Sequence, residues 1–230
     1  MPGLAHVAVQ DATDSRFTMA PTCRSGLPGG GPGNIPKKGI HVLVIDPSQN
    51  WNTLEKRLEK ETNPTFRRQL EEVIFHIRVE AELNVERALQ RLSPQAEYRL
   101  YDNANSTVIL TGVDEIRKTF YEESLLKFIH HDFQWSIDRV VVDDGIVITE
   151  GDLKVALRGS VLVAAGVDAD PAKFYLSESH HVVMWPFDDE GRLIGEQNYY
   201  GYTSAPEDVV KRPLALEEIG TVTGHTPDLD

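Results

Sequence analysis

The sequence has little cysteine, little positive charge and no long hydrophobic run. Cys23 is the only cysteine, which excludes an intramolecular disulfide and a cysteine-based metal site and is compatible with a reducing cytoplasm. The formal net charge is −13 and no Lys/Arg cluster offsets it, so we expect neither nucleic acid nor an acidic membrane surface as a partner. The first thirty residues lack the long apolar run of a secretory signal or a membrane span. We therefore expect a soluble, cytoplasmic protein.

Glycine and proline are concentrated near the N-terminus, in the stretch LPGGGPGNIPKKG at 27–39. Such a stretch loses much backbone entropy on folding and has little to bury, which predicts a flexible arm over 1–50. No Gly-Lys-Ser/Thr follows it, so the glycines do not indicate a phosphate loop. The remaining length suits one domain, expected over 51–205, followed by a C-terminal tail over 206–230 that holds a short helix.

The spacing of apolar residues predicts helices first and then a series of long strands. The helical pattern of 65–92 fits one long helix or two helices that meet near 82–84. This order predicts an α+β fold in which a strongly bent antiparallel sheet packs on N-terminal helices and encloses a cone-shaped pocket. The predicted helices are 51–60, 65–92 and 113–127, and the predicted strands are 96–102, 107–111, 132–142, 146–158, 172–186 and 192–203.

Two stretches of the sequence carry a family resemblance. TVILTGVDEIRKTFYEESL at 107–125 and MWPFDDEGRLIGEQNYY at 184–200 resemble a helix start and a closing hairpin of the nuclear transport factor 2-like (NTF2-like) superfamily, especially its SnoaL-like polyketide cyclase branch. The resemblance covers about 65–203 and implies the cone-shaped fold. It does not specify the activity, because that fold hosts isomerases, dehydratases, cyclases, epoxide hydrolases and binding modules.

The resemblance also implies where site residues should lie. Cyclases and epoxide hydrolases of this fold have an essential aspartate ten residues after the hairpin glycine, and this sequence has Gly201 there. The helix tyrosine of ketosteroid isomerases falls on His76, and their base and acid fall on Leu100 and Val183. The full isomerase set is therefore absent. Dehydratases of this fold use a pocket histidine, an acid and tyrosines, and the comparable stretches here contain His130, His131, Glu80, Glu150, Asp152, Tyr98 and Tyr101.

The residues themselves suggest histidines as proton acceptors. His76 and Glu80 are four apart on a predicted helix, where the carboxylate can orient the imidazole; the alternative is a solvated ion pair. His131 has the strand parity of Phe133 and Trp135, so it is expected to point inward, as a neutral base or as a core histidine bonded to the backbone. His181 shares a strand face with Val183 and Trp185, which we expect to be the inner face.

Carboxylates and aromatic residues complete the predicted site. Glu150 and Asp152 interrupt an apolar strand, where they fit either a raised-pKa acid or an exposed acid pair. Tyr98 and Tyr101 have opposite parity, so one of them should face inward. The predicted catalytic residues are His76, His131, His181, Glu80, Glu150 and Tyr101, and the predicted substrate contacts are Tyr98, Trp135, Asp152, Trp185 and Tyr199. No histidine spacing indicates a metal ligand set, and we expect no cofactor.

Two functional hypotheses follow. The first is a cofactor-free acid–base enzyme, a dehydratase, isomerase or cyclase, that acts on a small apolar oxygenated cyclic substrate. The second is a binding or interaction module of the same fold, which the glycine at position 201 favours. On either hypothesis Val182, Met184 and Ile194 make one face of the sheet too apolar for solvent, which predicts a homodimer through the sheet.

Overall fold

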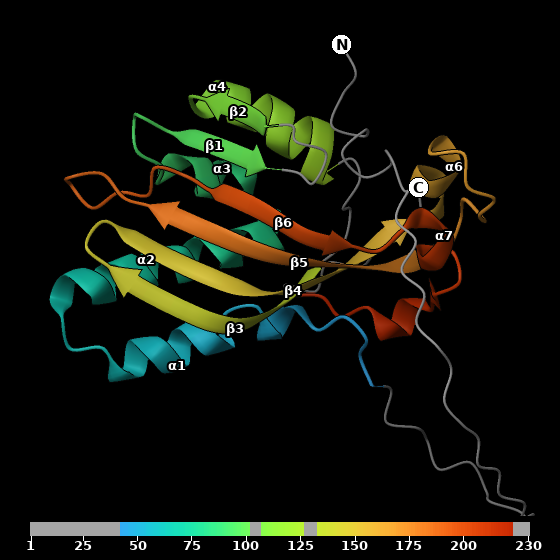
Figure 1. Cartoon of the computed structure of the whole chain (residues 1–230), viewed down its shortest axis with the longest axis horizontal. Helices are drawn as coiled ribbons and strands as arrows, with labels where there is room; N and C mark the ends of the chain where they lie inside the picture. Colours follow the sequence, from blue (N-terminus) through green and yellow to red (C-terminus); the bar gives the residue numbers. More distant parts are fainter. Residues whose placement is uncertain (1–41, 102–106, 127–132, 223–230) are drawn as a thin grey trace, which may run out of the picture.

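The chain folds around one curved, seven-stranded sheet with helices against one face (Figure 1). The structure is a computed structural model, and it describes residues 42–101, 107–126 and 133–222. The α+β architecture predicted from the order of elements is confirmed. Among the described residues, no helix has the length and apolar character needed to cross a membrane.

The strands follow the order β2-β1-β6-β5-β4-β3 across the sheet, and β7 pairs with β5. Neighbouring strands are antiparallel, except that β6 runs parallel to β1. The last long strand therefore lies between the β1–β2 hairpin and the β3–β5 meander. The strands are β1 (Glu97–Tyr101), β2 (Thr107–Thr111), β3 (Phe133–Asp143), β4 (Ile146–Arg158), β5 (Phe174–Pro186), β6 (Gln197–Thr203) and β7 (Pro213–Leu214).

The N-terminal helices cover the inner face of the sheet. α2 (Pro64–Ala81) lies behind the sheet in Figure 1 and starts at Asn63, whose side-chain oxygen accepts from the backbone N–H of Thr65. Its buried side includes Val73, Ile77 and His76. Leu83, with φ 53°, separates α2 from α3 and so resolves the predicted 65–92 stretch into two helices. The other N-terminal helices are η2 (Pro47–Gln49), α1 (Asn52–Lys60) and α3 (Val85–Gln90).

The helix predicted over 113–127 has an unusual winding. It begins as α4 (Val113–Glu115) and continues as the π-helix η3 (Ile116–Leu125), in which hydrogen bonds join residues five apart. Ile116 and Tyr121 are five apart and both are fully buried, so the wider turn brings them onto the same face.

Both ends of the described chain pack onto the sheet. Ile45 is buried and pairs with Ile219, and the side chain of Asn50 bonds to the backbone of β3 at Phe133 and Trp135. Packing therefore begins before residue 51, where composition places the start of the domain, and continues past residue 205. The remaining short helices are α6 (Gly159–Ala164), α7 (Pro206–Val209) and η4 (Leu216–Glu218), of which α6 was not predicted.

The predicted long hairpin is interrupted on its second strand. The turn at Asp188 to Gly191 is present, but β6 begins only at Gln197, and the backbone between them pairs with the start of β1. A Cβ atom at Gly195 would lie 2.3 Å from the carbonyl oxygen of Glu97. Only glycine allows the two backbones to approach so closely, and the next residue, Glu196, is directed into the core.

Candidate functional site

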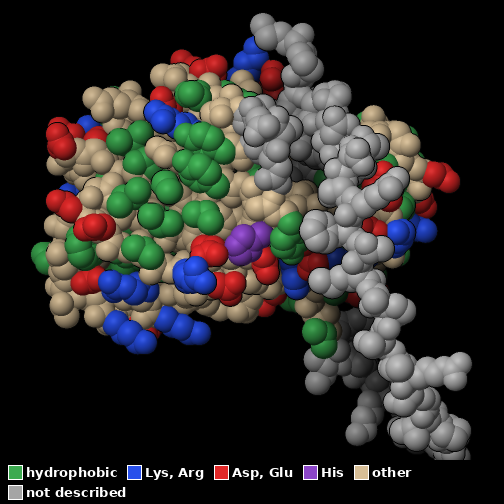
Figure 2. Space-filling view, in the orientation of Figure 1, with side chains coloured by type: hydrophobic (Ala, Val, Ile, Leu, Met, Phe, Trp, Pro, Cys, Tyr) green, Lys and Arg blue, Asp and Glu red, His purple; other side chains and the backbone are tan. Residues whose placement is uncertain are grey.

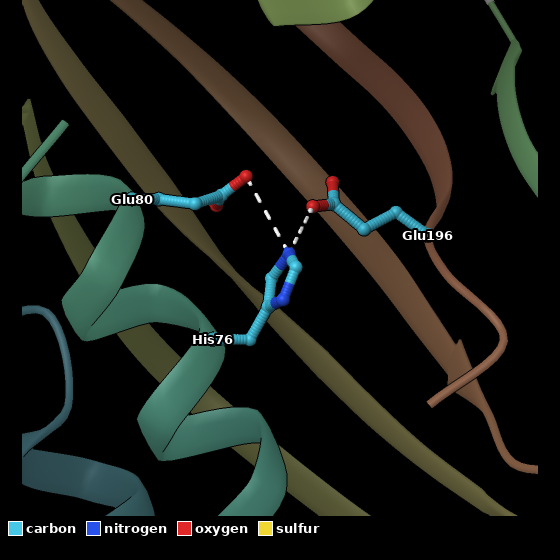
Figure 3. A group of neighbouring side chains, drawn as sticks. All are labelled: His76, Glu80 and Glu196. Atoms are coloured by element: carbon cyan, nitrogen blue, oxygen red, sulfur yellow. Dashed lines mark ion pairs between the residues drawn. The ribbon is translucent and has the colours of Figure 1, made fainter. Parts of the chain in front are cut away.

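A cluster of titratable side chains is buried between α2 and the sheet. His76 and Glu80 lie one turn apart on α2, and Glu196 reaches them from the segment before β6 (Figure 3). The Nε2 atom of His76 lies 3.5 Å from Oε1 of Glu80 and 3.4 Å from Oε1 of Glu196. Only 2% of His76 and 4% of Glu196 is exposed. The imidazole therefore sits between two carboxylates in the interior of the protein.

Two tyrosines connect His76 to Glu80 by a second route. The hydroxyl of Tyr98 on β1 lies 3.0 Å from Nε2 of His76 and 3.1 Å from the hydroxyl of Tyr121 on η3. Tyr121 in turn donates to Oε1 of Glu80 at 2.8 Å. Because Tyr121 donates to the carboxylate, it accepts from Tyr98, and Tyr98 then accepts from an Nε2–H of His76. The hydrogen bonds thus run in one direction, from imidazole to carboxylate.

The charges in the cluster shift the proton affinities of its members. Burial alone would lower the pKa of His76, but the negative charges of Glu80 and Glu196 overcome it and raise the pKa to about 10. Burial and the charge of Glu80 raise the pKa of Glu196 to about 7, although His76 opposes this shift. Burial raises the pKa values of Tyr98 and Tyr121 well above their ordinary range. At neutral pH the cluster therefore holds an imidazolium and two neutral phenols.

Glu196 has one oxygen that is held and one that is not. Its Oε2 accepts from Nδ2 of Asn198 at 3.0 Å. Its Oε1 is buried and has no hydrogen-bond partner among the described residues, although it lies in ion-pair range of His76. A carboxylate with one fixed oxygen and one unoccupied oxygen is suited to accept a proton from a third group.

His76, Glu80 and Glu196 are also the one set within the described ranges whose ligand atoms could converge on a metal ion, all within 4.8 Å of one another. The Nε2 atom that would bind the ion is engaged by Tyr98, and the imidazolium already supplies positive charge between the carboxylates. The three side chains therefore fit a cluster that holds a proton between two carboxylates, with the imidazolium in the place that a metal ion would take.

The structure separates the predicted site residues into two groups. His76, Glu80 and Tyr98 lie in the buried cluster. Trp185 packs edge-on against the imidazole of His76 at 5.9 Å between ring centres, and Trp135 packs on Trp185 at 6.2 Å. The predicted inner face of β5 is therefore correct. His131 lies outside the described residues.

Four other predicted site residues lie on the outer face of the sheet, away from the buried cluster. This fits the exposed-pair alternative for Glu150 and Asp152, and Tyr98 rather than Tyr101 is the inward tyrosine of β1. The inward orientation predicted for Tyr199 is wrong. Glu150 and Asp152 on β4 bond to His180, because the β4–β5 register pairs them with the outward residues of β5. The inner positions of β4 are instead those of Val147 and Thr149. Ile146 and Ile148 share the outer face with Glu150, which is why the apolar pattern of this strand was misleading.

Tyr199 and Tyr101 are the other two outward residues. Tyr199 is 36% exposed and stacks on the ring of Tyr101 at 4.3 Å. In β6 the inward side chain is that of Asn198, which is paired with Val183. Gly201 is exposed, so the position where the family comparison places its aspartate is not in the core here.

Sequence reasoning did not select Glu196, Asn198 or Tyr121 as site residues. Glu196 and Asn198 were recognisable only as polar residues of the hairpin, because regular alternation from Gly191 directs the odd-numbered positions inward. The detour at Gly195 reverses this parity. Tyr121 lies next to Phe120, which α-helical spacing selects for burial, whereas the π-helix buries Tyr121 completely.

Comparison with known proteins gives a structural likeness only. No family model and no curated protein matches the sequence. The chain is similar in structure to NTF2-like proteins and to proteins classed as SnoaL-like polyketide cyclases, the group that its sequence resembles.

Three solved structures illustrate this likeness. A protein from Shewanella denitrificans classed as a SnoaL-like polyketide cyclase has a TM-score of 0.48 at 16% identity, covering 62% of this chain and 96% of its own. A protein of the same class from Jannaschia has a TM-score of 0.46 at 15% identity, covering 61% and 90%. An NTF2-like protein from Anabaena variabilis has a TM-score of 0.46 at 11% identity, covering 64% and 96%.

Proposed function

We propose that this chain is a cytoplasmic, cofactor-independent acid–base enzyme that acts on a small, mostly apolar, oxygenated cyclic compound, as a dehydratase, isomerase or cyclase. The observation that carries the proposal is the carboxylate of Glu196, which is buried beside an imidazolium with Oε2 held and Oε1 unoccupied. Its pKa of about 7 allows it both to accept and to return a proton near neutral pH.

In the proposed reaction, Oε1 of Glu196 takes a proton from a carbon next to a carbonyl group of the substrate. The electron pair of the broken C–H bond moves onto the carbonyl oxygen, which becomes an enolate. The positive charge of His76 stabilises that negative oxygen. Glu196 then returns the proton to another carbon, which is isomerisation, or to a departing hydroxyl group, which leaves as water.

The cost of the cluster supports a chemical role. Moving ions into a protein interior costs several kcal/mol for each ion, and a buried ion pair often stabilises a fold no better than apolar side chains of similar volume. Perturbed pKa values that arise from burial and specific partners concentrate at functional sites. An apolar core at positions 76, 80 and 196 would serve the fold at least as well.

A specific observation favours the second hypothesis, a non-catalytic binding or interaction module. Tyr98 and Tyr121 have no exposed surface, and His76 is nearly as buried. Two surface depressions in the described part of the chain are lined by Arg68, Arg91 and Gly191 and by Glu55, Phe75 and Arg78, and neither reaches the cluster. A substrate would have to displace side chains to reach Glu196.

Substrate screening with one matched pair of variants tests the two hypotheses. Hydroxylated and keto polycyclic compounds are screened for thermal shift and for turnover, and each hit is repeated with Glu196→Gln. We expect turnover to fall at least about 100-fold, the scale of a lost general base. The control Glu71→Gln removes an exposed carboxylate of α2 and should leave turnover unchanged. Turnover that survives Glu196→Gln would refute the assigned base, and binding without turnover would favour the binding module.

We also propose that two copies of the chain associate through the outer face of the sheet. Figure 2 shows hydrophobic side chains gathered over this face, which includes half-buried Val182 and Met184 and exposed Tyr199. The border of this patch carries charges of both signs that form ion pairs, such as Arg139 with Glu150. A patch without excess charge of one sign is where two copies of a strongly acidic chain can meet with least repulsion.

A further inference from the structure

A second chain of buried polar side chains leads from Glu196 along β6 and β5. Nδ2 of Asn198 donates to Oε2 of Glu196 at 3.0 Å, and Oδ1 of Asn198 lies 3.1 Å from Nδ1 of His181. The Nε2 atom of His181 lies 2.6 Å from the hydroxyl of Ser179. These residues are more than nine-tenths buried. They continue the site beyond the cluster around His76.

The chemistry of these groups fixes the position of every hydrogen. An amide oxygen can only accept, so Nδ1 of His181 carries the proton and donates to Asn198. In the neutral imidazole Nε2 is then an acceptor, which takes its hydrogen bond from Ser179. Burial favours this neutral form, since it lowers the pKa of His181 to about 4. Donation therefore runs from Ser179 to His181, to Asn198 and to Glu196.

This direction has a consequence for Asn198. Turning its amide over would place Oδ1 against the carboxylate of Glu196, so that two acceptors would face each other, and would require the other tautomer of His181. The carboxylate of Glu196 therefore selects this orientation of the amide, and the Nδ1–H of His181 supports it by donating to Oδ1. With Oε2 occupied in this way, Oε1 is the oxygen that is left facing His76.

We propose that Asn198, supported by His181 and Ser179, is the positioning residue of Glu196: it fixes Oε2, favours the ionised carboxylate and leaves Oε1 as the atom that accepts a proton. Its catalytic meaning rests on the proposed function. The effect of Asn198 on the ionisation of Glu196 belongs to the folded protein and can be measured without a substrate. The other groups that face Glu196 are His76 and Glu80 from α2, Tyr98 from β1 and Tyr121 from η3.

The test is a carboxyl-carbon NMR titration of the full chain labelled at glutamate, with the Glu196 signal assigned by its loss in Glu196→Gln. Asn198→Leu keeps the approximate size of the side chain and removes the donor. We expect it to raise the proton affinity of Glu196 about tenfold or more, as for a lost hydrogen bond to a charged group. His181→Phe should raise it by a smaller factor, because the amide of Asn198 then loses the donor that supports it.

Thr149→Val is the matched control. Thr149 is a fully buried polar residue of the same core, and its hydroxyl accepts from Nε1 of Trp185 without touching Glu196. The replacement of Thr149 should lower the stability of the protein and leave the proton affinity of Glu196 unchanged. If Asn198→Leu does not fold, Asn198→Ala is measured by the same criterion.

A Glu196 titration that changes less than twofold in a folded Asn198 variant overturns the positioning role. If the titration shifts as expected, the positioning role stands even where no compound is turned over. That second result counts against the proposed function alone, so the two failures are distinguishable.

Discussion

His76 is the residue whose protonation should dominate the pH dependence of stability. Its pKa in the folded protein, about 10, lies above the ordinary value of 6.5, so the folded state binds the proton more tightly than the unfolded state does. The resulting stabilisation is complete below pH 6.5 and is lost as the pH rises toward 10. Glu196 acts in the same direction at lower pH, since its pKa rises from 4.5 to about 7. His181 acts oppositely: its pKa falls to about 4, and its contribution is lost as the pH falls from 6.5.

We therefore expect the free energy of unfolding to be greatest near pH 5 to 6 and to fall by about 3 kcal/mol between pH 7 and pH 10. Urea denaturation at steps of pH measures this. The variant His76→Gln cannot bind the proton, so it should be less stable at pH 7 and should lose less stability than wild type between pH 7 and pH 10. Equal alkaline slopes for wild type and variant would show that His76 is not protonated in the native cluster.

At the level of elements, the segment from Gly191 to Gln197 determines which side chains of β6 enter the core. Gly195 passes so close to β1 that a Cβ atom would lie 2.3 Å from the carbonyl oxygen of Glu97 and 2.7 Å from the ring of Tyr98. Gly195→Ala should destabilise the fold by more than about 2 kcal/mol, because the backbone of β1 or β6 must move.

Gly166→Ala is the control for that substitution. Gly166 has φ 84° but no atom within 4 Å of its Cβ position, so its replacement should cost only about 1 kcal/mol of backbone strain. Thermal and urea unfolding of both variants provide the comparison. Equal losses would mean that the close approach at Gly195 is not a constraint.

Most elements could be predicted from the sequence because their signals are local. The apolar spacing of α2, the Asn63-Pro64 start and the alternation of β5 each depend on neighbouring residues, and the structure confirms them. The inward orientation of His181 on its strand and the position of His76 on the buried side of α2 followed from the same local periodicities.

The remaining parts of the site depend on contacts between distant segments. The parity of β6 is set by pairing with β1, about a hundred residues earlier, and a shift of one residue exchanged Tyr199 for Asn198 on the inner face. The burial of Tyr121 depends on π-helical winding, which the spacing of Ile116 and Phe120 does not reveal. Neither signal is present in a single stretch of sequence.

At the scale of the whole molecule, the outer face of the sheet predicts the oligomeric state. Tyr199 on β6 and Val141 on β3 expose 36% and 53% of their surface on the face of the sheet opposite α2. We expect light scattering after size-exclusion chromatography to give about twice the mass of one chain. Met184→Asp should convert the protein to a monomer, whereas Val163→Asp, on exposed α6, should not. A wild-type monomer at all concentrations tested would refute the dimer.

The parallel pairing of β1 and β6 also means that the sheet is joined by a strand from late in the chain. β6 joins the β1–β2 hairpin to the β3–β5 meander, and it is the last long strand of the chain. During synthesis the residues of both parts of the sheet precede the strand that unites them, and such long-range pairing is slow to form. Glu196 and Asn198 arrive with that strand. The buried cluster of His76, Glu80 and Glu196 is therefore completed only when β6 pairs with β1 and β5.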